Sequence, residues 1–211
     1  RSSVNEGEYD FHTPIGSLAL TFRPSLESFK RAPVSFLRHN KVQSTTLRKK
    51  ILSNGKKTII GMSWRSEASA RGAADRNIGL VELAQTLASV NTQLVCLQYG
   101  DVDNEIEILE RDFGIQIIKI TEIDNFNDVD GLASLIMSCD LIVSTTSVTV
   151  HLAGALGANV RVLLPFPARW IWGRLGSESP WYKSILPYRQ KEPGNWNNVL
   201  DCVAEDLSTL I

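Results

Sequence analysis

Short apolar runs alternate with segments of helical periodicity along most of the chain. Six runs are nearly continuous in apolar residues, as strands buried on both faces of a sheet are: 57–63, 94–98, 115–120, 141–144, 160–164 and 185–189. Helices are predicted over 80–90, 104–113, from Asp128 or Asp130 to about Cys139, over 147–156 and over 195–210, with Gly114 and Gly157 as stops. This alternation predicts an α/β domain with a doubly wound, Rossmann-like parallel sheet.

Residues 1–56 lack this alternation. They contain turn signals at Thr13-Pro14, Arg23-Pro24 and Ala32-Pro33, and a predicted helix over 42–52. We interpret residues 1–56 as the tail of a preceding domain plus a linker, and residues 57–211 as the Rossmann-like domain. The chain starts at Arg1 and lacks the apolar core of a signal peptide, so we expect it to be a piece of a longer protein.

Composition narrows the class of protein. Hydrophobic residues make up 43% and charged residues 21%, which is typical of a globular domain and excludes disordered or collagen-like chains. No apolar run approaches the ~18 to 20 residues that a membrane-spanning helix needs, so no transmembrane segment is expected. Cys96, Cys139 and Cys202 are widely spaced, which argues against disulfides or zinc and favours a reducing, cytoplasmic location.

Charge is distributed unevenly. Residues 1–57 carry 11 basic and 4 acidic side chains, whereas residues 58–211 carry 11 and 19. The basic stretch 23–57 either attracts phosphates or nucleic acid, or is a solvated linker and helix. No aromatic stacking pattern or nucleic-acid motif accompanies it, so we favour the second interpretation and expect no nucleic-acid partner.

A run of hydroxyl residues, 144–147, leads from a predicted buried strand into a helix. Free amides and hydroxyls at a helix start attract anions, so Thr145, Thr146 and Ser147 are candidates for holding a diphosphate. The alternative is that they only cap the helix. His151, one turn further on, either reaches a ligand or is a core histidine with a carbonyl partner.

Two more loops leave strand ends toward the same rim of the predicted sheet. Ser63-Trp64-Arg65 follows the first strand, where the arginine either neutralises a phosphate or is simply exposed. Gln98-Tyr99-Gly100-Asp101 follows the second strand, a position where a Rossmann rim meets a nucleoside. Asp101-Val102-Asp103 matches a metal-binding pattern, but carboxylates that open a helix are explained by capping, and we assign no metal.

Residues 165–182 are rich in aromatic side chains. Trp170, Trp172 and Trp181 either stack on sugars or bases at the rim or pack an interdomain seam. The sequence lacks the glycine fingerprints of dinucleotide-binding oxidoreductases and P-loop NTPases, and the serine elbow of hydrolases.

Several short motifs recur in order along the chain: Ile60-Gly61-Met62-Ser63-Trp64-Arg65, Arg76-Asn77-Ile78, Cys96-Leu97-Gln98-Tyr99-Gly100-Asp101, His151-Leu152-Ala153-Gly154-Ala155-Leu156-Gly157, Leu163-Leu164-Pro165-Phe166, Ser179-Pro180-Trp181-Tyr182 and Arg189-Gln190. Taken together, these motifs resemble the carboxyl-terminal half of heptosyltransferase-like glycosyltransferases of family nine, above all bacterial proteins in which this module follows tetratricopeptide repeats. The resemblance runs over nearly the whole chain, including residues 10–22.

The resemblance implies a GT-B architecture of two Rossmann-like domains, of which residues 57–211 bind a nucleoside-diphosphate sugar. By that likeness Ser147, Val148 and Thr149 hold the diphosphate, His151 occupies the place of the motif histidine, 63–65 face the phosphates, and 99–101 with 120–122 line the nucleoside. The family usually has Asp where this chain has Thr146, which puts the sugar or the activity in doubt. The catalytic residue is unassigned, with Asp10 and His12 as minor candidates.

The leading hypothesis is a glycosyltransferase module that transfers a sugar, without a metal or other cofactor, from a nucleotide donor to an acceptor (glycan, lipid-linked sugar or protein) held by a missing amino-terminal domain. Its main rival is a non-catalytic nucleotide- or protein-binding module of the same fold. A sugar-nucleotide epimerase of related fold is a third alternative.

Overall fold

The computed structural model describes residues 7, 10–52, 55–66, 74–89, 91–173, 176 and 178–210. Its contacts divide the chain into two compact units, Arg1–Pro33 and Val34–Ile211. The structure describes these short helical segments in the first unit, none with a buried residue: η2 (Ile15–Ser17), α1 (Leu18–Phe22) and η3 (Leu26–Phe29). No described helix is long and apolar enough to cross a membrane.

The boundary between the units differs from the one we expected after residue 56. Helix α2 (Lys41–Ile51) belongs to the second unit, because Leu47 and Ile51 are buried in the core of the α/β domain. Asn40 begins this helix by accepting hydrogen bonds from the amides of Val42 and Gln43, both at 3.1 Å. The segment predicted as a linker therefore contributes a packed helix.

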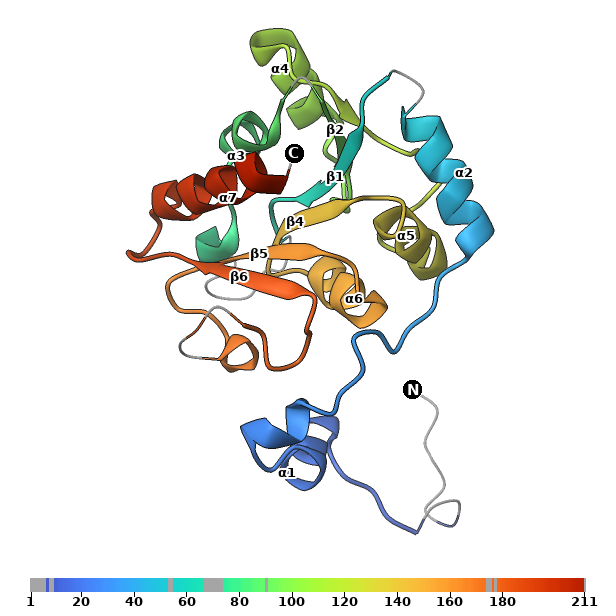
Figure 1. The fold of residues 1–211 in the computed structure, drawn as a ribbon, viewed down its shortest axis with the longest axis vertical. Helices are drawn as coiled ribbons and strands as arrows, with labels where there is room; N and C mark the ends of the chain where they lie inside the picture. Colours follow the sequence, from blue (N-terminus) through green and yellow to red (C-terminus); the bar gives the residue numbers. More distant parts are fainter. Residues whose placement is uncertain are drawn as a thin grey trace. The chain divides into compact units, whose positions relative to one another are not determined.

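A six-stranded sheet forms the centre of the second unit (Figure 1). Its strands are β1 (Thr58–Ser63), β2 (Thr92–Cys96), β3 (Ile117–Ile118), β4 (Leu141–Thr145), β5 (Val160–Leu164) and β6 (Ile185–Arg189). They pair in the order β3-β2-β1-β4-β5-β6, and every pairing is parallel. The doubly wound Rossmann-like fold predicted from the sequence is confirmed.

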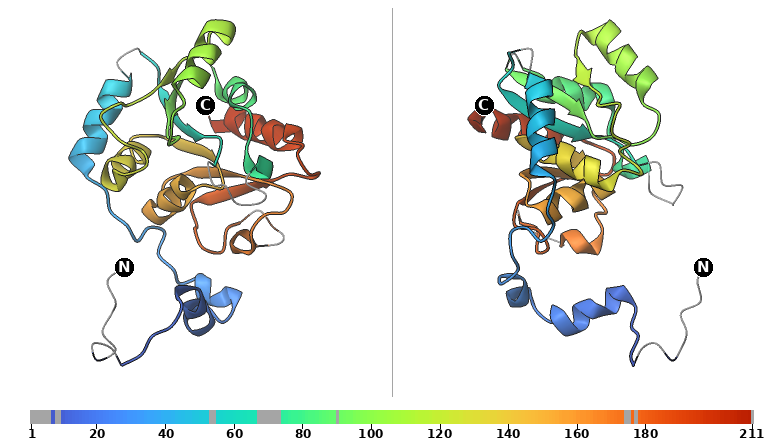
Figure 2. Two further views of the ribbon diagram at one scale, coloured as in Figure 1. Left: turned by 180° about the vertical axis from the view of Figure 1, so that it is seen from behind. Right: turned by 90° about the vertical axis from the view of Figure 1, so that its right-hand side faces the viewer.

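Helices cover both faces of the sheet, as the views in Figure 1 and Figure 2 show. Helices α2, α5 (Val129–Ile136) and α6 (Val148–Leu156) pack on one face, and α3 (Leu80–Leu87), α4 (Asp103–Phe113) and α7 (Asn197–Leu210) on the other. Each face of the sheet carries its own hydrophobic core, and successive strand residues point into opposite cores. Ile59 lies in the core beneath α2, α5 and α6, and Ile60 in the core beneath α3, α4 and α7. This is why the strands are continuous apolar runs.

Local sequence signals set the ends of several helices. Gly114 (φ 67°) and Gly157 (φ 76°) end α4 and α6 in the left-handed conformation, as predicted. Asp128 caps α5, where its Oδ1 accepts a hydrogen bond of 2.8 Å from the amide of Gly131. The third strand is shorter than predicted and is limited to Ile117–Ile118 at the edge of the sheet.

Candidate functional site

The order of the strands reverses between β1 and β4, which are neighbours in the sheet although far apart in the chain. The last pair between these two strands is Ser63 with Ser144. Open α/β sheets bind ligands outside the carboxyl ends of their strands at such a switch point. Helix α6 starts directly after β4, so the predicted hydroxyl run lies at this place.

The first turn of α6 has no side-chain cap in the described structure. Ser147 is the N-cap residue, but within the described structure its side chain makes no capping hydrogen bond; its Oγ lies 3.3 Å from Ser144 Oγ instead. The interpretation of Ser147 as a side-chain cap is therefore wrong. The hydroxyls of Thr145 and Thr146 are buried and have no hydrogen-bond partner among the described residues. Unpaired amides and hydroxyls at a helix start are suited to an anion.

Two further residues of this turn were predicted to bind the donor. Val148 is 73% exposed, whereas the side chain of Thr149 is buried. Any role of Thr149 in ligand binding therefore involves its amide more than its hydroxyl.

Gln98 follows β2, and its side chain forms hydrogen bonds with the end of β1 and the loop after it. The residue is 2% exposed. Its Oε1 accepts hydrogen bonds from Ser63 Oγ and from the amides of Trp64 and Arg65, at 3.0, 3.0 and 3.1 Å. Its Nε2 donates to the carbonyl of Tyr99 at 3.1 Å. The side chain predicted to meet a donor is thus occupied in shaping the loop after β1.

Trp64 and Arg65 share the carboxylate of Glu105 on α4. Trp64 Nε1 donates to Glu105 Oε2 at 2.9 Å, and its indole is 1% exposed in the core between the sheet and α3. Arg65 Nε donates to Glu105 Oε1 at 3.1 Å, and its Nη2 donates to the carbonyl of Asp101 at 2.9 Å. The Trp64 side chain is therefore structural, and the guanidinium of Arg65 already has a negative partner. Sequence reasoning missed Glu105.

The loop after β2 carries a pair of aromatic rings. Tyr99 is partly buried, and its ring centre lies 5.7 Å from that of Phe126, which is 70% exposed. Asp101 is exposed, and its Oδ1 accepts a hydrogen bond of 3.2 Å from the Asp103 amide, as a helix-opening carboxylate does. Phe126 was not predicted, because an isolated aromatic residue in a loop carries no periodic signal.

The segment 120–122, predicted to line a nucleoside, is mostly engaged elsewhere. Ile120 is buried in the core, and Glu122 forms an exposed ion pair with Lys50 of α2. Arg174 and residues 67–73 of the loop after β1 lie outside the described residues. Asp10 and His12 belong to the first unit.

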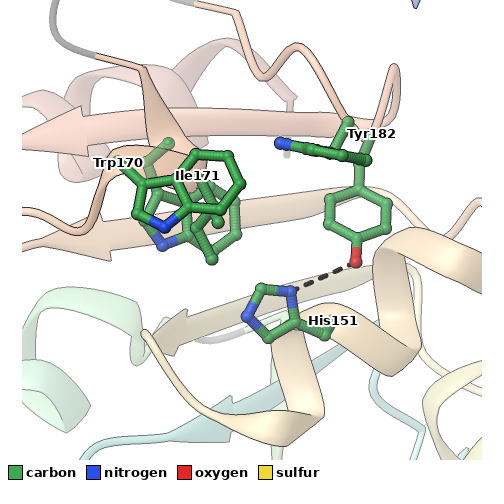
Figure 3. Close-up of a pocket in the computed structure, with 6 residues that line it drawn as sticks. His151, Trp170, Ile171 and Tyr182 are labelled. Carbon is green, nitrogen blue, oxygen red and sulfur yellow. Dashed lines mark hydrogen bonds between the residues drawn. The ribbon is translucent and has the colours of Figure 1, made fainter. Parts of the chain in front are cut away.

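His151 is held by aromatic neighbours (Figure 3). Its Nδ1 lies 3.2 Å from the hydroxyl of Tyr182, and its ring stacks on Trp172 with a centroid distance of 5.3 Å. Tyr182 approaches α6 closely because Gly154 has no side chain: a Cβ there would lie 2.6 Å from Tyr182 Cγ. His151 is thus neither a simple core histidine with a carbonyl partner nor freely exposed.

A pocket of about 230 Å³ opens beside His151. Among the described residues, its lining comes from α6 and from the segment 165–182: His151, Trp170, Ile171, Trp172, Trp181 and Tyr182. Trp170 is 70% exposed, whereas Trp172 is buried. Of the tryptophans predicted either to stack on a ligand at the rim or to pack a seam, Trp170 therefore presents an exposed ring, whereas Trp172 packs inside the domain.

Burial, with the charge of Arg169, lowers the pKa of His151 below its ordinary value of 6.5. Because the unfolded chain then binds the proton more readily, the stability that His151 contributes is complete above pH 6.5 and is lost as the pH falls below it. Urea unfolding between pH 7 and 5 should show a smaller loss of unfolding free energy for His151→Gln than for the original protein. Parallel curves for the two proteins would contradict the assignment.

The fold and the switch-point arrangement define an α/β domain of the Rossmann-like type found in GT-B glycosyltransferases. A family-nine glycosyltransferase from Veillonella parvula matches with a TM-score of 0.58 at 12% identity, over 82% of this chain and 52% of that one. The ADP-heptose lipopolysaccharide heptosyltransferase II of E. coli matches with a TM-score of 0.59 at 16% identity, over the same shares. At such low identity the likeness shows the fold alone.

One curated protein, FlbA of Caulobacter vibrioides, is 28% identical over 206 residues. These make up 96% of this chain and 34% of FlbA, so the chain spans about a third of that relative and about half of the solved structures. No family model matches the sequence.

Proposed function

We propose that this chain is the donor-binding module of a glycosyltransferase. It binds a nucleoside-diphosphate sugar at the start of α6, and the sugar passes to an acceptor held by a further domain. The observation that carries the proposal is the uncapped first turn of α6 at the switch point of the sheet. The GT-B-like fold supports it, as does the fact that the match covers only 52% of each solved neighbour.

The start of α6 suits the chemistry of such a transfer. When the acceptor oxygen attacks the anomeric carbon, the bond to the diphosphate oxygen breaks and its electron pair stays on the leaving group. The amides of Val148 and Thr149 and the hydroxyl of Ser147 would stabilise this growing negative charge together with the helix dipole. The acceptor proton would leave to a base outside the residues described here. Fixed donors of this kind can replace a metal ion, so we propose metal-independent transfer.

A non-catalytic nucleotide- or protein-binding module is the second candidate. Arg65 is the cation nearest in sequence to the end of β1. Its guanidinium is bound by Glu105 and by the Asp101 carbonyl, so less of its positive charge is available to stabilise a leaving diphosphate. Thr146 also stands where the resembling family has a carboxylate. Both features favour binding without turnover.

Calorimetric titration of the protein with UDP, GDP and ADP, each with EDTA and with Mg²⁺, tests the proposal. At least one nucleotide should bind, with the same affinity in EDTA, because the proposed anion site consists of amides and hydroxyls. Failure of all three would refute donor binding. Release of free sugar or transfer from the matching nucleotide sugars would then exclude the non-catalytic alternative.

A further inference from the structure

The pocket beside His151 is suited to a group with apolar surface. Its walls are three tryptophans, an isoleucine, a tyrosine and the imidazole. Trp170 and Trp181 meet edge to face with ring centres 6.3 Å apart and form one corner of it. Its 230 Å³ is below the ~300–1,000 Å³ of pockets for drug-sized ligands, so it has room for about one ring or ring substituent.

Polar partners in the pocket are few. The described lining residues include no carboxylate, amide or amine side chain; they offer the Tyr182 hydroxyl, the His151 nitrogens and the indole N–H groups. The indole nitrogen of Trp172 is itself buried. A sugar with a hydroxyl on every carbon would lose water here without regaining its hydrogen bonds, which is costly. An acetamido group replaces one such hydroxyl by an amide, which brings a methyl group, one carbonyl acceptor and one N–H donor.

The His151 ring can supply the matching donor. When the Tyr182 hydroxyl donates to Nδ1, the proton of the neutral imidazole lies on Nε2. Figure 3 shows that this second nitrogen points away from Tyr182. The lowered pKa of His151 keeps the ring neutral at neutral pH, so the pocket offers a hydrogen bond rather than a charge.

We propose that this aromatic pocket binds the acylamino group of an N-acylated sugar, and that it selects such sugars over fully hydroxylated ones. The inference rests on the proposed function, because His151 is the fourth residue of α6 and lies one turn from the proposed diphosphate site. The acyl methyl group packs against the indole and isoleucine walls, and its carbonyl accepts from His151. Trp170 covers the sugar face.

The test separates the pocket from nucleotide binding by using sugars without a nucleotide. Methyl N-acetyl-β-glucosaminide and methyl β-glucoside differ only in the acetamido group. Each is titrated up to its solubility limit while the indole N–H signals of the tryptophans are followed by NMR. The N-acetyl sugar should shift the Trp170 and Trp181 signals and bind about tenfold more tightly than the glucoside, the discrimination expected for a small apolar group in an apolar pocket.

Two variants check the location. Trp170→Ala should abolish the preference and leave the affinity for free UDP, GDP or ADP unchanged. Phe166→Ala removes an exposed aromatic residue of the same segment that does not line the pocket, and should keep the preference. Equal binding of both sugars, or no shift with either, would overturn the inference. If the sugars are discriminated but no nucleotide binds, the pocket stands and the proposed diphosphate site fails.

Discussion

Replacing Ser147 by aspartate is expected to weaken binding of a nucleoside diphosphate tenfold or more, equivalent to ~1–3 kcal/mol. The carboxylate would lie at the start of α6, where the diphosphate is proposed to bind, and two negative groups in a partly desolvated place repel each other. The measurement is calorimetric titration with the nucleotide that the original protein binds.

The fold should tolerate this change. Ser147 makes no side-chain capping bond in the described structure, whereas aspartate is a good N-cap, so the melting temperature should stay equal or rise. Asn195→Asp is the matched control: it puts the same charge before α7, where Asn195 already accepts a hydrogen bond from the Asn197 amide. Equal nucleotide affinity in both variants would exclude α6 as the anion site.

Replacing Gln98 by leucine is expected to lower the free energy of unfolding by about 3 kcal/mol or more. The change leaves the amides of Trp64 and Arg65 and the hydroxyl of Ser63 without their shared acceptor, and an unpaired buried donor costs ~1–3 kcal/mol. Leucine has nearly the volume of glutamine, so little of the loss comes from a cavity. Urea unfolding monitored by circular dichroism measures it.

Gln116→Leu is the control for this variant, because Gln116 is exposed and bonds only to Glu110 on the surface among the contacts found. We expect its unfolding free energy to change by less than ~0.5 kcal/mol. Gln98→Glu keeps an acceptor for the three donors and should recover part of the loss. A Gln98→Leu protein as stable as Gln116→Leu would show that the loop after β1 does not depend on this side chain.

Much of the fold was predictable because its causes are local. A strand buried on both faces must be apolar throughout, so 160–164 and 185–189 were predicted with the bounds that the structure has. Gly114 and Gly157 end helices because their conformation is unfavourable for other residues. The short β3 was overpredicted, since Ile115 and Ile120 are apolar for packing beyond the strand.

The segment before β1 shows where local reasoning fails. Residues 34–56 carry many charges and a predicted helix over 42–52, and were interpreted as part of the linker. Leu47 and Ile51 nevertheless bury one side of α2 against the domain, and Arg48 forms an ion pair with Asp140 at 2.9 Å. Whether a short amphipathic helix packs on a domain depends on a surface formed by segments distant in sequence. The local pattern of residues in the helix does not contain this information.

The sequence by itself determined the parallel sheet, its two helical layers and the loops that reach the switch point, because alternation and helix stops depend on neighbours in the chain. Only the tertiary structure decided which of the predicted site residues are free to meet a ligand. Gln98, Trp64 and Arg65 are engaged by partners 33 to 41 positions away, whereas the start of α6 is left uncapped. A side chain's availability depends on the nearest donor or acceptor in space, and folding alone brings Glu105 to Trp64 and Tyr182 to His151.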